Sequence, residues 1–170
     1  MGSTANNSLQ IGIRDDVIII IAEGEIRAGE TFALNDYLLP YIEAGGGLKK
    51  TYLDLSRCEY MDSTFIGFIV ALTRKCREKS CDIIRIVNPS EKAKTALRKL
   101  ATLDEIDVID AAPVRDIPVF KLAPHRGSFA SKKNIELMFE ANQALSGLSE
   151  ENRIEFQALL DELRRVLGDS

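Results

Sequence analysis

The sequence predicts an α/β protein in which a mixed β-sheet is covered by helices and followed by a C-terminal helical extension. Between residues 9 and 111, short apolar runs alternate with segments whose apolar residues recur at helical spacing. Such alternation is typical of parallel strands joined by right-handed crossovers. A second helical region follows a proline-rich stretch, which indicates helices added to the core domain.

The first three elements are predicted to be two strands and a helix. Residues 9–13 alternate apolar and polar side chains, and residues 17–22 are mostly β-branched, so we expect an antiparallel hairpin whose second strand is buried on both faces. A helix opens near residue 28. We expect Pro40 to kink it or end it early, and the glycines at 45–47 to stop the chain from continuing as a helix.

The central elements alternate between strand and helix. Residues 51–55 form a short apolar strand, which a polar turn connects to a helix from Ser63 to about Glu78. A β-branched run at 82–87 predicts the next strand, and Ser90 begins a helix with apolar residues on one face. A last short strand is expected at 106–109.

The chain after residue 111 changes character. We assign the core domain to residues 9–111, a linker or strap to 112–130, and a two-helix extension to 131–168. Part of the strap, within 116–122, is expected to pack as an edge strand. Ser131 opens the first helix of the extension and Ser149 caps the second. Two interpretations stay open: the extension packs on its own domain, or it mediates dimer formation or partner docking.

Composition disfavours several classes of function. The net charge of −4 leaves no basic footprint for nucleic acid, and the longest apolar run, at 17–22, is far too short to span a bilayer. The three cysteines, Cys58, Cys76 and Cys81, lack metal-ligand spacing, and we interpret them as reduced thiols of a cytoplasmic protein. The single histidine, His125, is expected to be a surface loop residue.

The start of the central helix is the most informative stretch. Asp62, Ser63 and Thr64 are helix-capping residue types, so their side-chain oxygens can accept hydrogen bonds from the first amides of the helix. A phosphate on a hydroxyl there would lie close to those amides and to the positive end of the helix dipole. One interpretation is that these residues only cap the helix. The other is that Ser63 is a phosphorylation switch.

A family resemblance favours the switch. Asp54-Leu55-Ser56, followed by Asp62-Ser63-Thr64 and then Gly67, resembles the signature of STAS domains and, more narrowly, of bacterial anti-sigma factor antagonists. The resemblance implies the α/β STAS fold, with Ser63 as phosphoacceptor and Thr64 as a second candidate. It implies a partner-binding set of Gly24, Glu25, Arg27, Asp62, Ser63, Thr64, Phe65 and Ile66.

The resemblance also implies partners. In that family the unmodified antagonist binds an anti-sigma factor that is also a serine kinase, and a metal-dependent serine phosphatase restores the phosphorylated form. The sequence departs from the family at Arg27, where many members carry aspartate, and at Phe65, where many carry glycine. Both departures alter the expected docking surface.

Two other hypotheses remain open. The chain can be an unphosphorylated STAS scaffolding subunit of a signalling or transport assembly, with the C-terminal helices forming a homodimer or other assembly contact. Less favoured is a small enzyme or nucleotide binder that uses Asp54 and Asp62. The sequence has no P-loop and no nucleophile paired with a base, so it implies neither an enzyme nor a cofactor or metal site.

Overall fold

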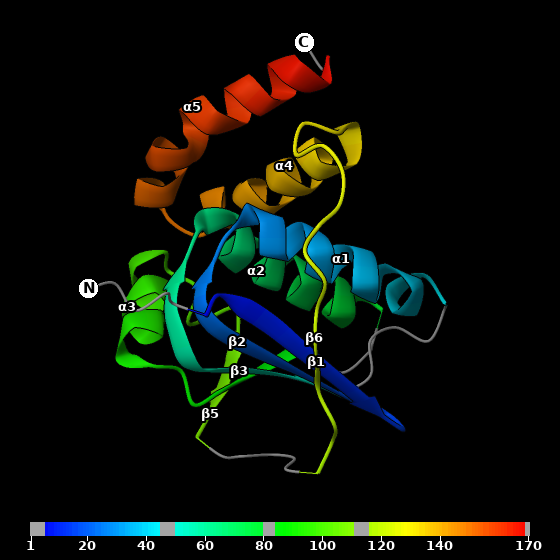
Figure 1. Ribbon diagram of the computed structural model, residues 1–170. Helices are drawn as coiled ribbons and strands as arrows, with labels where there is room; N and C mark the ends of the chain where they lie inside the picture. The colour runs from blue at the N-terminus through cyan, green and yellow to red at the C-terminus, as the bar shows by residue number, and fades with distance from the viewer. Residues whose placement is uncertain (1–5, 45–49, 80–83, 111–115, 169–170) are drawn as a thin grey trace, which may run out of the picture.

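The computed structural model describes residues 6–44, 50–79, 84–110 and 116–168 (Figure 1). Within these ranges the chain forms strands and helices in the following order: β1 (Ser8–Arg14), β2 (Val17–Ile26), α1 (Ala28–Glu43), β3 (Lys50–Met61), α2 (Ser63–Glu78), β4 (Ile84–Val87), α3 (Glu91–Lys99), β5 (Asp107–Ile109), β6 (Phe120–Lys121), α4 (Lys132–Ser146) and α5 (Glu150–Leu167). The mixed sheet and the two C-terminal helices confirm the predicted fold class.

All the described strands belong to one sheet, in the order β5-β4-β3-β2-β1-β6. β2, β3, β4 and β5 pair in parallel, whereas β1 pairs antiparallel with β2 and with β6. The predicted hairpin and the predicted edge strand in the strap are therefore both present. Because β2 and β3 run parallel, their carboxyl ends meet at one edge of the sheet, where Ile26 pairs with Met61.

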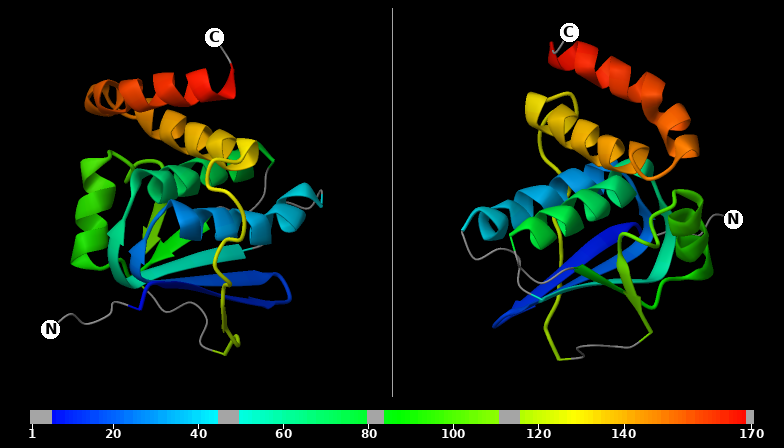
Figure 2. Two further views of the ribbon diagram at one scale, coloured as in Figure 1. Left: turned by 45° about the horizontal axis from the view of Figure 1, so that its top comes forward. Right: turned by 180° about the vertical axis from the view of Figure 1, so that it is seen from behind.

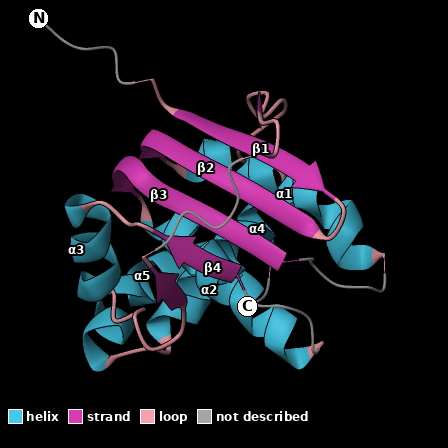
Figure 3. Ribbon diagram, turned by 90° about the horizontal axis from the view of Figure 1, so that it is seen from below, coloured by secondary structure: helices cyan, strands magenta, loops and turns pink. Residues whose placement is uncertain are grey.

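Four of the described helices form layers on one face of the sheet, while α3 lies beside it, near the end of β3 (Figure 1). α1 and α2 cover this face, α4 lies across them, and α5 lies outside α4 (Figures 1 and 2). Figure 3 looks onto the sheet from the opposite side, where no helix lies in front of the strands. The core between sheet and helices includes the fully buried side chains of Ile11, Ile18, Leu55, Phe65 and Ile86.

Two strands are longer than predicted. β2 does not end at Ala22 but continues to Ile26. β3 does not end at Leu55 but continues to Met61, and Cys58 and Met61 on this extension are buried. The extension pairs with the end of β2 through two register shifts, so its buried residues follow no simple alternation. Of the two outcomes predicted for Pro40, the early end is not found: α1 continues to Glu43, and the Ala44 amide donates to the Pro40 carbonyl.

The C-terminal extension packs on its own domain. α4 lies so close to α2 that a Cβ atom on Gly67 would be 2.1 Å from the carbonyl oxygen of Ala141. Asn152, at the start of α5, donates to the carbonyls of Leu100 (2.8 Å) and Leu145 (3.0 Å). Leu145, Phe156 and Leu160 of the extension join the hydrophobic core. We call α4 and α5 together the C-terminal hairpin.

Candidate functional site

The first turn of α2 is fixed by Asp62. Its carboxylate Oδ1 accepts a hydrogen bond from the Phe65 amide at 2.9 Å, so Asp62 is the N-cap and Ser63 the first helical residue. The Asp62 amide donates to the Ile26 carbonyl at 3.1 Å. The predicted capping role of Asp62 is therefore present, and it ties the start of α2 to the end of β2.

Ser63 meets the C-terminal hairpin. Its hydroxyl donates to the Oδ1 atom of Asn142 on α4 at 2.8 Å. Asn142 is fully buried, and its Nδ2 donates to the Met138 carbonyl one turn earlier in the same helix at 2.7 Å. The candidate phosphoacceptor is thus already bonded to a residue for which the family resemblance gave no role.

A groove of about 400 Å³ also opens beside Ser63, between the end of β3, the start of α2, α3 and α5. Its walls carry mixed charges. The charged residues that line it are Glu59, Asp62, Lys92, Lys99 and Glu155. Ser63 is only partly buried, so its hydroxyl faces Asn142 on one side and this groove on the other.

The end of β2 and the following Arg27, residues 24–27, lie beside the start of α2, where the Asp62 amide donates to the Ile26 carbonyl. Gly24 has a positive φ of 76°, and the Glu25 amide donates to Asn7 Oδ1 at 2.8 Å. Glu25 and Arg27 form an exposed ion pair (3.1 Å), and the Arg27 guanidinium lies 4.5 Å from the centre of the Tyr60 ring. Arg27 therefore forms a cation–π contact where many family members carry an aspartate.

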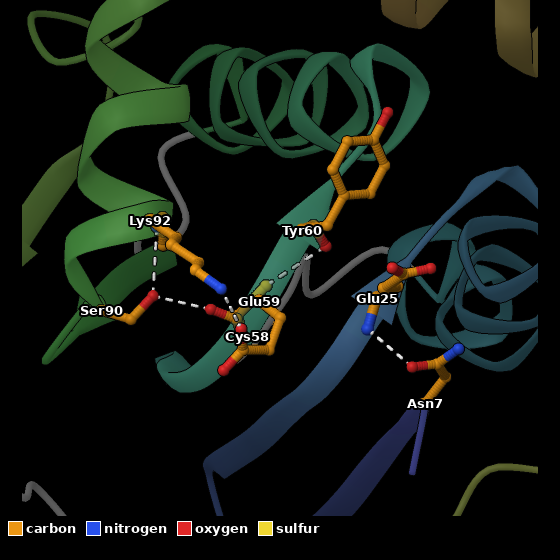
Figure 4. Close-up of polar contacts among 8 residues, drawn as sticks. Asn7, Glu25, Cys58, Glu59, Tyr60, Ser90 and Lys92 are labelled. Carbon is orange, nitrogen blue, oxygen red and sulfur yellow. Dashed lines mark hydrogen bonds and ion pairs between the residues drawn. The ribbon is translucent and has the colours of Figure 1, made fainter. Parts of the chain in front are cut away.

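The end of β3 also contacts the start of α3. Figure 4 shows Ser90 and Lys92 on one side of the end of β3, and Glu25 with Asn7 on the other. The Ser90 hydroxyl donates to the Cys58 carbonyl at 2.6 Å, and Lys92 pairs with Glu59 at 2.5 Å. These contacts connect the end of β3 to the start of α3.

Four predicted site residues are buried: Gly24, Thr64, Phe65 and Ile66. Thr64 is 4% exposed, Phe65 is fully buried and Ile66 is 1% exposed. The start of α2 faces the core, and the Phe65 ring fills space there that a glycine at this position would leave empty. The side chains of Phe65 and Ile66 therefore belong to the core. Among the predicted residues, Asp62, Ser63, Glu25 and Arg27 have polar side chains that are not fully buried.

The electrostatics of the site centre on Asp62. Burial raises the pKa of the Asp62 carboxyl above its ordinary value, and hydrogen bonds from the Phe65 and Ala28 amides oppose this only in part. Nearby, burial raises the pKa of the Cys58 thiol to about 11. Cys58 is therefore a protonated thiol at neutral pH, as expected for an unreactive core cysteine. Cys81 lies outside the described residues.

Asp54 and Asp62 do not form a pair. Asp54 Oδ1 accepts from the Ser56 amide at 2.9 Å. The last seven residues of β3, from Leu55 to Met61, separate Asp54 from Asp62 along the chain. Among the described residues, no group of three His, Cys, Asp or Glu side chains is arranged to hold a metal ion.

The prediction for His125 was wrong. Its side chain is 9% exposed and packs edge-on against Phe32, with ring centres 5.5 Å apart. Its Nδ1 lies 3.3 Å from an Asp36 carboxylate oxygen and its Nε2 lies 3.0 Å from Asn134 Nδ2. Sequence reasoning placed it on the surface because neighbouring proline and glycine indicated a loop, and it missed that α1 and α4 enclose this loop.

Comparison with known proteins identifies the domain. The family model described as "STAS domain" matches residues 8–116, which is more than half of the chain. The chain belongs to the STAS domain family. The matched segment ends before the C-terminal hairpin, so the hairpin is an addition to the STAS domain.

Two solved structures show the same fold. The structure of the anti-sigma factor antagonist SpoIIAA in its unphosphorylated form is 15% identical, with a TM-score of 0.51, over 62% of this chain and 90% of that chain. That of the Bacillus cell fate determinant SpoIIAA in the phosphorylated form is 16% identical, with a TM-score of 0.52, over 62% and 93%. In the described part of the present STAS protein, no helix is long and apolar enough to cross a membrane.

Proposed function

We propose that this STAS protein is an anti-sigma factor antagonist, a cytoplasmic binding module that engages an anti-sigma serine kinase when Ser63 is unmodified. One observation carries the proposal: Ser63 lies in the first turn of α2, next to the Asp62 cap, and is one of the residues that line an open groove. Solved relatives of this fold include SpoIIAA in both unphosphorylated and phosphorylated forms. Ser63 is the phosphoacceptor in this proposal, and the buried Thr64 is the second candidate.

The chemistry of the site explains how a phosphate acts as a switch. A phosphoserine carries a charge of about −1.5 to −2 at neutral pH. At Ser63 this charge would stand beside Asp62, whose carboxyl is already partly desolvated. A docked partner would exclude water from both charges, so we expect docking to the phosphorylated form to be unfavourable. A metal-dependent serine phosphatase would return the protein to its binding form.

Partner contact is assigned to the surface around Ser63 that remains accessible. It comprises the groove and residues 24–27 at the end of β2. Tyr60, which lines the groove, is 44% exposed. Arg27 supplies a cation at this surface and Glu25 an anion. Many family members carry an aspartate at the position of Arg27, so the charge presented to the partner is reversed in this protein. We therefore expect its partner kinase to present an acidic group there.

Phosphate mapping and binding measurements test the function. Peptide-level mass spectrometry of the protein purified from its native host should find phosphate on Ser63. By calorimetry with the host's anti-sigma serine kinase, Ser63→Ala should bind like the wild type and Ser63→Asp at least about tenfold more weakly. The control is Ser56→Asp, which adds the same charge at an exposed position on β3. Equal affinities for Ser63→Ala and Ser63→Asp would remove the switch.

A second candidate function is a STAS scaffolding subunit that is never phosphorylated. The hydrogen bond from Ser63 to Asn142 favours it, because a hydroxyl held by a buried amide already has a structural role. In that case, neither Ser63 nor Thr64 would carry phosphate under growth or stress. The hairpin would then be the assembly element, and exposed Ile154 and Val166 on α5 are its candidate contacts for a homodimer.

A further inference from the structure

We propose that the C-terminal hairpin is a cover over the Ser63 face of α2, and that its closed position and a phosphate on Ser63 exclude each other. The inference rests on the proposed function, since it describes how the same site is regulated. The hairpin lies outside the matched STAS domain, yet it contacts the hydroxyl that the switch would modify.

The first argument is the closeness of the two helices. Ser63 and Gly67 are four residues apart in α2 and therefore lie on one face of it, one turn from each other. At Gly67 the helices approach until a single added carbon would be 2.1 Å from the Ala141 carbonyl oxygen. A phosphate is far larger than a methyl group. On the Ser63 side chain it would enter the same contact layer one turn away.

The second argument is the chemistry of the Ser63–Asn142 contact. The Ser63 hydroxyl is the donor and Asn142 Oδ1 the acceptor. Phosphorylation forms an Oγ–P bond, breaks the terminal P–O bond of a nucleoside triphosphate, and passes the hydroxyl proton to the kinase. The ester oxygen then has no hydrogen to donate, and two oxygen acceptors face each other.

Asn142 cannot reverse its amide without loss. Its Nδ2 already donates to the Met138 carbonyl at 2.7 Å, and the side chain is fully buried. Turning the amide over would offer Nδ2 to the phosphate but would bring Oδ1 against the Met138 carbonyl. One acceptor would be left without a donor in either orientation, and burial makes that unfavourable.

The charges around the groove do not compensate. The groove is lined by three acidic residues, Glu59, Asp62 and Glu155, and by two basic ones, Lys92 and Lys99. Lys92 is already paired with Glu59. The added dianion therefore meets no surplus of positive charge while the hairpin is closed. Moving α4 away from α2 admits water to the phosphate and removes the opposed Asn142 oxygen.

Hydrogen exchange of the full chain tests the inference without any kinase. Phosphoserine is installed at position 63 by genetic code expansion, and Ser63→Asp is made alongside it. We expect the amides of α4 to exchange at least about tenfold faster than in the unmodified protein, while β2 and β3 keep their protection. Phosphoserine at position 56, on the exposed part of β3, is the matched control and should leave α4 unchanged.

Two glycine variants calibrate the displacement. Gly67→Ala forces a carbon into the Ala141 carbonyl and should open α4 without any charge. Gly147→Ala is its control, because the nearest atom to the added carbon is 3.9 Å away and φ is −78°. In an Asn142→Ala background, phosphoserine 63 should accelerate exchange of α4 less than in the wild type, since the opposed oxygen is gone.

The outcomes separate this inference from the proposed function. Unchanged α4 exchange with phosphoserine at position 63 would overturn the cover, even if kinase binding holds. Loss of protection in β2 and β3 together with α4 would also overturn it, because the hairpin would then not move separately. If Ser63 carries no phosphate in the host, the proposed function fails while the exchange result still stands.

Discussion

The hydroxyl of Ser63 and the amide oxygen of Asn142 lie 2.8 Å apart, although 79 residues separate them along the chain. The hydrogen bond joins the start of α2, within the STAS domain, to the helix that follows the domain. It is the direct link between the candidate switch residue and the C-terminal hairpin. Its strength can be measured in the unmodified protein.

We expect a double-mutant cycle between Ser63→Ala and Asn142→Ala to give a coupling free energy of about 1 kcal/mol. The cycle is preferable to a single variant, because alanine also raises the helix propensity at position 142. Urea denaturation of the four proteins provides the measurement. Ser56→Ala with Asn142→Ala is the control cycle, and additive free energies in the Ser63 cycle would contradict the contact.

The second link between hairpin and domain is Asn152, which is 1% exposed and donates to two carbonyls from different elements. Asn152→Ala leaves the Leu100 carbonyl without this donor, whereas Leu145 retains the Leu148 amide. We expect a loss of about 2 kcal/mol in the free energy of unfolding, because a buried acceptor is left unsatisfied.

Arg153→Ala is the matched control for Asn152→Ala. It lies at the next position in α5 and removes an exposed ion pair with Glu150. Such pairs contribute little, so we expect a change within about 0.5 kcal/mol. Similar losses for the two variants in urea denaturation would show that the Asn152 bonds do not anchor the hairpin.

The two asparagines show how far the sequence predicts this site. In the sequence, Ile135, Met138 and Leu145 recur at the spacing of one helix face, and Asn142 falls on the same face, seven residues after Ile135. A polar residue on such a stripe indicates a buried hydrogen bond. Its partner, however, depends on where α4 packs, and amphipathic spacing does not specify which surface covers the stripe.

The parallel pairing of the central strands was predictable for a different reason. Alternating strands and helices with short connections restrict the sheet to parallel neighbours, so the central part of the fold follows from the pattern. The length of β3 did not follow from the pattern, because Ser56, Arg57 and Glu59 are polar and indicated a turn. In the structure they are exposed residues of the strand. Only pairing with β2, through its register shifts, shows that these residues continue the strand.

Asp62 predicts a pH dependence. Burial raises the pKa of its carboxyl in the folded state above the unfolded value of about 3.9, so the folded state binds the proton more tightly. The contribution of Asp62 to stability is therefore largest below the unfolded pKa, and it falls as the pH rises through the folded pKa. At neutral pH the folded protein bears the cost of a partly buried charge.

Asp62→Asn should remove this cost and keep the cap, because asparagine also accepts from the Phe65 amide. We expect Asp62→Asn to gain stability relative to the wild type between pH 4 and pH 7, as measured by urea denaturation at several pH values. Asp62→Ala loses the cap and should cost about 1 kcal/mol near pH 4. A difference between Asp62→Asn and wild type that shrinks as the pH rises would contradict the assignment.

His125 predicts a packing effect rather than a surface one. Its ring packs against Phe32 and Phe129, and its nitrogens lie near Asp36 of α1 and Asn134 of α4. These contacts join the strap to both helices. We expect His125→Ala to lower the free energy of unfolding by about 2 kcal/mol, because aromatic and polar contacts are lost together. In the His125→Ala variant, a low concentration of protease should also cleave within residues 116–130 faster than in the wild type.

Two variants separate the contributions to the His125 effect. His125→Phe keeps an aromatic ring between Phe32 and Phe129 but removes both polar contacts, so its loss should be intermediate. Arg126→Ala changes the exposed neighbour and should behave like the wild type. If His125→Ala and Arg126→Ala are equally stable and equally resistant to protease, the strap is held by other contacts. The edge pairing of β6 with β1 and the buried Ile117 would then be the attachments to examine.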